Sequence, residues 1–150
     1  MSGLIDKINQ DLVAAQKARD ETVVSTLRFL LANIKNAQIA KGEELSEPEI
    51  IEQIQKDVKR HRESIEAFEG GNRSDLVEKE KMQLEVLGKY LPAQLSRGEI
   101  AKIVDEVILQ VGAKGPADMG GVMGQVMARV RTQADGAAVS DIVKEKLFPS

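Results

Sequence analysis

The sequence predicts an all-α protein built from two helical subdomains. Apolar side chains recur at steps of three and four residues along most of the 150-residue chain, and no segment shows the period of two that is typical of a strand. Aromatic residues make up only 3% of the chain and Trp is absent, so the core must be built from aliphatic side chains and Met. A charged fraction of 30%, rich in Lys and Glu, also suits an all-helical protein.

Two amphipathic helices are predicted at the start of the chain. The first follows Ser2, a candidate N-cap, and the polar run at 17–20 ends it or links it onward. The second is more strongly apolar and stops at Gly42. The apolar stripes of the two helices are Leu4, Ile5, Ile8 and Leu12, and then Val23, Leu27, Leu30, Leu31, Ile34 and Ala37.

Two more helices are predicted before the first strong break in the pattern. Residues 46–49 have the sequence of a capping box with proline in the first turn, and Gly70 and Gly71 end the helix that follows. Asn72 or Ser74 is the candidate cap of the fourth helix. The apolar faces are Ile51, Ile54, Val58, Ile65 and Phe68 in the third helix, and Leu76, Val77, Leu84, Leu87 and Leu91 in the fourth.

Pro92 marks the predicted domain boundary, because proline disfavours a helical conformation for the residue before it. We therefore expect an N-terminal four-helix subdomain over residues 1–92 and a C-terminal three-helix subdomain over residues 93–150, which is small for an independent core. The first helix of the second part begins with a capping box at 96–99. The stripes of its first and last helices are Ile100, Ile103, Val104, Val107 and Ile108, and Val139, Ile142, Val143 and Leu147.

The middle helix of the second part, residues 119–130, contains an unusual number of glycines. Pro116 and Asp118 mark its start, and Asp118 is the candidate N-cap. Each interior glycine costs about 1 kcal/mol relative to alanine, so some function or contact should offset this cost. The glycines of the first two turns are Gly120, Gly121 and Gly124, and the apolar stripe beside them is Met119, Val122, Met123, Val126, Met127 and Val130.

Gly120, Gly124 and Ala128 lie four residues apart and form a bare strip along this helix. A bare strip allows close approach of a neighbouring helix, or of a ligand such as a nucleic-acid sugar-phosphate chain. If the ligand is a phosphate chain, the helix N-terminus favours its negative charge. The candidate phosphate contacts nearest in sequence are Lys114, Arg129 and Arg131.

No catalytic, metal or cofactor site is predicted. Cysteine is absent, and the sequence has no phosphate-binding loop, dinucleotide-binding fingerprint or nucleophile elbow. His61, the one histidine, is interpreted as a partly buried, hydrogen-bonded residue. Glu80 falls on the apolar stripe of its helix and is expected to form an interior structural ion pair with Arg28. A paired-carboxylate site would need a second inward acid, and none stands out.

The start of the chain and the lack of a long apolar window point to a cytoplasmic location. The first ten residues have an acid at Asp6 and no long apolar run, which argues against a signal peptide. No window is long and apolar enough for a bilayer span, so no membrane partner is expected. The net charge of −3 argues against strong non-specific nucleic-acid binding, although it allows a local basic face.

Several segments resemble a known family. Residues 71–80 (GNRSDLVEKE) and 87–96 (LGKYLPAQLS) are similar to the signature of YqeY-like proteins, and TLR at 26–28 and DMG at 118–120 fit it too. Residues 122–127 (VMGQVM) resemble the tail of GatB, the B subunit of the glutamine-dependent amidotransferase that converts misacylated Glu-tRNA or Asp-tRNA. The resemblance extends over nearly the whole chain.

This resemblance implies a two-part helical fold and an association with tRNA, because the GatB tail is the element that grips the tRNA body. It implies no catalysis by this chain alone, so a carbon–nitrogen ligase activity is suggested by similarity only. The implied partners are tRNA and components of an amidotransferase or an aminoacyl-tRNA synthetase. The alternative is a helical protein-interaction module that uses the glycine–methionine surface of residues 119–130 and binds no RNA.

Overall fold

A computed structural model describes residues 3–148 and confirms the all-α fold, with no strand in this part of the chain. The chain divides into two compact units, Met1–Leu91 and Pro92–Ser150. The helices are α1 (Gly3–Ala18), α2 (Glu21–Lys41), α3 (Glu47–Gly70), α4 (Ser74–Gly88), α5 (Arg97–Val111), α6 (Met119–Val130) and α7 (Gly136–Leu147), with the 3₁₀ turns η1 (Pro116–Asp118) and η2 (Arg131–Gln133) on either side of α6. The predicted cap at Ser2 lies outside the described residues.

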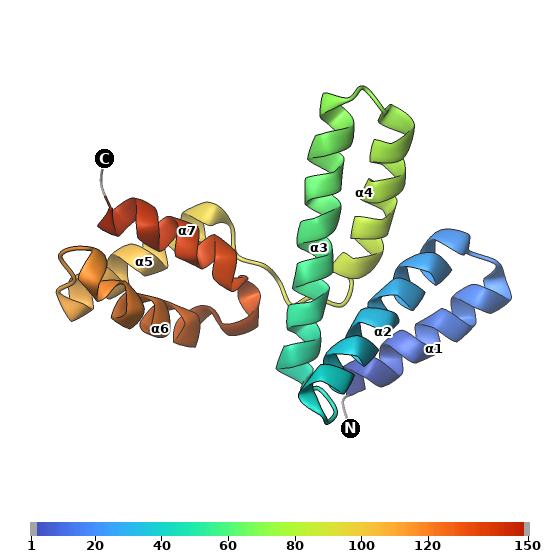
Figure 1. Cartoon of the computed structure of the whole chain (residues 1–150), viewed down its shortest axis with the longest axis horizontal. Coiled ribbons are helices and arrows are strands. Elements are labelled where there is room, and N and C mark those ends of the chain that lie inside the picture. Colours follow the sequence, from blue (N-terminus) through green and yellow to red (C-terminus); the bar gives the residue numbers. More distant parts are fainter. Residues whose placement is uncertain (1–2, 149–150) are drawn as a thin grey trace. The chain divides into compact units, whose positions relative to one another are not determined.

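The first unit consists of two helical hairpins, α1 with α2 and α3 with α4 (Figure 1). Asp20 caps α2 by accepting the backbone N–H of Val23 at 3.2 Å. Neither Asn72 nor Ser74 caps α4, which begins at Ser74 without a side-chain cap. The core side chains come from all four helices and from the segments that follow α2 and α4: Ile8, Leu27, Leu30, Ile34, Leu45, Ile50, Ile54, Val58, Val86, Leu87 and Tyr90.

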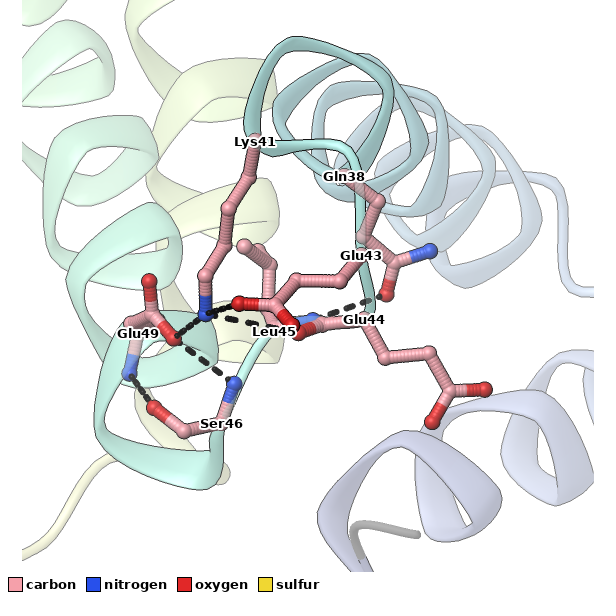
Figure 2. Close-up of polar contacts among 7 residues, drawn as sticks. All are labelled: Gln38, Lys41, Glu43, Glu44, Leu45, Ser46 and Glu49. Atoms are coloured by element: carbon pink, nitrogen blue, oxygen red, sulfur yellow. Dashed lines mark hydrogen bonds and ion pairs between the residues drawn. The ribbon is translucent and has the colours of Figure 1, made fainter.

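Lys41 ties the end of α2 to the start of α3 (Figure 2). Its Nζ lies 2.6 Å from Oε1 of Glu49 and 3.5 Å from Oε1 of Glu43. The same Glu49 oxygen accepts the backbone N–H of Ser46 at 2.9 Å, which completes the predicted capping box. The hydrogen bond from Lys41, followed by those from Ser46, lowers the pKa of the Glu49 carboxyl to about 2.

The second unit packs α5, α6 and α7 around a core of its own (Figure 1). The capping box at Ser96 and Glu99 starts α5, and Gly112 ends it in the left-handed conformation with φ 67°. No helix runs through Pro92, since α4 ends at Gly88. Within residues 3–148, none of the helices has the length and apolar character needed to cross a bilayer.

Candidate functional site

The valine and methionine stripe of α6 faces the core of the second unit, as predicted. Val122, Val126 and Val130 are fully buried, and they pack with side chains of α5 and α7. The three methionines of the stripe are half-buried at the edge of the same core. This packing fixes the rotation of α6, and therefore decides which residues the helix presents to solvent.

The opposite side of α6 is an open surface, which we call the glycine face: Gly120, Gly121, Gly124 and Ala128. All four residues are exposed. A Cβ atom built on any of the three glycines would meet no heavy atom within 4 Å. No other described part of the second unit therefore packs on these glycines, so within this unit the alternative of a neighbouring helix packed on them does not hold.

The start of α6 differs from the prediction. Asp118 immediately precedes the helix, but its carboxylate makes no cap hydrogen bond to it. Instead Oδ2 of Asp118 accepts the backbone N–H of Lys114 at 2.8 Å and that of Gly115 at 3.4 Å. The carboxylate thus closes the loop before α6 and places a negative charge at the helix N-terminus, where an incoming phosphate would be repelled.

The three predicted cations occupy different surroundings. Arg129 is engaged within its own unit, since it forms an ion pair with Oε2 of Glu106 at 2.8 Å and a hydrogen bond with Oε1 of Gln110 at 2.8 Å. Lys114 and Arg131 are exposed, and neither forms an ion pair with any described residue. They flank α6 at its two ends, so the length of a 12-residue helix, about 18 Å, lies between them.

Arg131 also has an unusual backbone. Its φ of 47° and ψ of −117° place it in a region that favours glycine. The turn that contains it is anchored by hydrogen bonds from the start of the second unit. The backbone N–H of Leu95 donates to the Gln133 carbonyl at 2.8 Å, and the side-chain amide of Gln94 donates to the Thr132 carbonyl at 2.9 Å. These anchors hold the strained residue in place.

The predicted interior pair of Arg28 with Glu80 is wrong. Arg28 is exposed on α2, whereas Oε2 of Glu80 contacts Nδ1 of His61 across the α3–α4 hairpin. Only 16% and 19% of the His61 and Glu80 side chains are exposed. The interpretation of His61 as a partly buried, hydrogen-bonded histidine is therefore confirmed. The partner of Glu80 is His61 rather than Arg28, because α3 and α4 pack closely together.

Asp57 is an inward acid on α3 that was not predicted from the sequence. Its side chain is 2% exposed, accepts a hydrogen bond from Nδ2 of Asn33 at 3.0 Å and pairs with Arg60 at 3.0 Å. Burial raises the pKa of Asp57, while Arg60 and Asn33 act against the rise. The sequence indicates the inward position of Asp57, because it lies three residues after Ile54 and four before His61 and so shares the inner face of the helix with them.

Comparison with known proteins gives a family and several relatives. The family model described as Yqey-like protein matches residues 5–147. Altered inheritance of mitochondria protein 41, mitochondrial, from Pyrenophora tritici-repentis is 31% identical over 150 residues, which cover 95% of this chain and 80% of that protein. The protein of the same name from Lachancea thermotolerans is 34% identical over 75% of this chain and 62% of its own length.

A third relative is one of the subunits of the Glutamyl-tRNA(Gln) amidotransferase of Thermococcus gammatolerans. It is 37% identical over 86 residues, which cover 55% of this chain but only 14% of that much longer protein. The predicted cytoplasmic location is contradicted by the two fungal relatives, because their names place those proteins in mitochondria.

Proposed function

The chain belongs to the YqeY-like family, and on that premise we propose that it is a non-catalytic helical module that binds tRNA through the glycine face of α6. The observation that carries the proposal is the open glycine face, where a Cβ would meet nothing within 4 Å. A surface without side chains allows a sugar-phosphate backbone to approach the helix closely. The amidotransferase relative from Thermococcus gammatolerans supports a link with tRNA-dependent amidation and contact with amidotransferase components.

The charged residues around α6 indicate where the RNA backbone would lie. Asp118 disfavours a phosphate directly at the helix start, so the backbone of the RNA should lie along the flank of the helix. Lys114 and Arg131 are the cations free to contact phosphates at the two ends of this flank. Arg129 contributes less, because its guanidinium is already paired with Glu106.

Gly124→Leu tests the proposal directly. The new side chain would project from an exposed helical position into open space, so the fold should persist, and replacing an interior glycine should stabilise the helix by somewhat less than about 1 kcal/mol. If the glycine face is the contact surface, tRNA binding should be lost. Gly98→Leu is the matched control, since Gly98 is an exposed helical glycine of α5 with only the Ser96 hydroxyl nearby, at 3.9 Å.

The assay is a titration of tRNA at two salt concentrations, followed by fluorescence anisotropy of labelled tRNA. Phosphate contacts make affinity fall as salt rises, and removal of one contacting cation should reduce the salt slope by about 1. Unchanged binding by a folded Gly124→Leu protein would remove the glycine face from consideration as the RNA contact.

The second candidate function is a protein-interaction module that uses the same surface. The net charge of −3 and the internal pairing of Arg129 favour it, because both reduce the positive potential available to RNA. Absence of salt-dependent tRNA binding by the wild-type chain is the result that would favour this alternative.

A further inference from the structure

A second candidate site lies in the first unit and includes no residue of α6. It is a pocket of about 350 Å³ between α2, α3 and α4. His61 and Glu80, which contact each other, line it together with Phe29. Phe29 is 49% exposed, and the guanidinium carbon of Arg60 lies 4.9 Å from the ring centroid. The pocket therefore combines flat groups with polar ones.

The polar groups of the pocket offer both donors and acceptors. Glu80 engages Nδ1 of His61, which leaves Nε2 of the imidazole without a partner among the described residues. The Ser64 hydroxyl and the Gln83 amide also line the pocket without a partner in residues 3–148. A hydroxyl, an amide and an imidazole nitrogen together match a ligand that has its own donors and acceptors along one edge.

The charged side chains around the pocket restrict the class of ligand that it can bind. Arg60 is neutralised by the buried carboxylate of Asp57, and Glu80 adds a negative charge beside His61. A phosphate or carboxylate ligand would meet this carboxylate without a free cation to offset it. A metal ion has no suitable set of ligands either, since no group of three His, Cys, Asp or Glu side chains in the described residues is arranged to hold one. The class of ligand that fits these charges is a neutral, flat, polar molecule.

We propose that this pocket binds a single nucleobase, which stacks on the face of Phe29 that Arg60 leaves free and forms hydrogen bonds with His61 and Gln83. Bases stack on aromatic rings and on Arg guanidinium planes, and are recognised by hydrogen bonds to their edges. The volume lies at the lower end of the range for ligand pockets, about 300–1,000 Å³, which suits one base rather than a larger group. The base comes either from a free nucleotide or from an unpaired RNA residue. The proposal does not depend on tRNA binding at α6.

The histidine provides the assay. His61 is the only histidine of the chain, so its imidazole gives isolated signals in proton NMR spectra of the full-length protein. Adenosine, adenosine monophosphate and a four-nucleotide single-stranded RNA are titrated separately, with ribose 5-phosphate as the probe that lacks a base. Each of the base-containing probes should shift the His61 signals in a saturable manner, and ribose 5-phosphate should not.

The relative affinities identify the source of the base. Binding of the RNA at least about tenfold tighter than that of adenosine would assign the pocket to unpaired RNA residues, since further contacts to the strand would add affinity. Equal affinities for adenosine monophosphate and the RNA would assign it to free nucleotides. The proposal is overturned if none of the base-containing probes shifts His61, or if ribose 5-phosphate shifts it as strongly as adenosine does.

One variant of a pocket residue and one control test the position of the base, and both keep His61 as the NMR reporter. Phe29→Ala should weaken adenosine binding between about 5-fold and 150-fold, the range reported by alanine substitution for loss of one base–aromatic stack. Met82→Ala is the matched control, because Met82 is 52% exposed on the same unit but does not line the pocket. Wild-type affinity of the Phe29→Ala protein, or an equal loss in Met82→Ala, would refute the placement of the base.

Discussion

Replacing Arg131 by glycine should stabilise the second unit. A non-glycine residue held at φ 47° and ψ −117° carries a conformational cost on the order of 1–3 kcal/mol. Glycine adopts this conformation without strain, but it loses more chain entropy on folding, about 0.5–1 kcal/mol. The difference predicts an increase of about 0–2.5 kcal/mol in the free energy of unfolding for Arg131→Gly, with a midpoint of about 1 kcal/mol.

Arg131→Ala separates the backbone effect from the effect of charge. Alanine removes the same guanidinium but keeps a Cβ, so it retains the strain. Because the Arg131 side chain is exposed, its loss alone should change stability by less than about 0.5 kcal/mol. Urea denaturation should show a higher midpoint with an unchanged m value for the glycine variant only. Equal stabilities of the two variants would refute the argument from backbone strain.

The same pair of variants tests the tRNA binding proposed above. Both remove a cation that is free at the end of α6, so both should reduce the salt slope of tRNA binding by about 1. The glycine variant would then be more stable and yet a weaker tRNA binder. A loss of binding in one variant but not in the other would show that the turn conformation, rather than the charge, matters for RNA.

Two further predictions concern the first unit. Glu80→Ala should cost about 1–3 kcal/mol, because it leaves Nδ1 of the largely buried His61 without its partner. The change Glu85→Ala, at an exposed position, should lower the free energy of unfolding by less than about 0.5 kcal/mol in a urea titration. Equal losses of stability in the two variants would contradict a stabilising contact between His61 and Glu80. The pKa of Glu49 is lowered from 4.5 to about 2, so its contribution to stability is complete above pH 4.5 and is lost as the pH falls toward 2. The stability difference between wild type and Glu49→Gln should shrink across that interval, and a difference independent of pH would refute the assignment.

The helices and several of their ends were readable from local patterns. The capping boxes at Ser46 and Ser96 are formed, and Gly42 ends its helix with positive φ. These features depend on side chains within four residues of each other, so the sequence contains all the partners.

Features that depend on how helices meet were not readable in this way. A helical pattern places Glu80 on an inner face, but it does not say which residue of another helix lies opposite. The exposure of the glycine face is of the same kind, because the same spacing of Gly120 and Gly124 suits both a packed strip and an open one. Asp118 was misassigned for a different reason, since an Asp side chain accepts backbone N–H groups on either side of it in sequence.

The glycines of α6 also constrain the order in which the second unit forms. A helix of 12 residues is at best marginal in isolation, even when it is rich in alanine. Gly120, Gly121 and Gly124 together disfavour the helix by about 3 kcal/mol, so residues 119–130 should be almost entirely non-helical before α5 and α7 pack against them. Its valines reach full burial only between α5 and α7. The folding nucleus of the unit is therefore expected in α5 and α7, and α6 should be its first segment to open in amide hydrogen exchange.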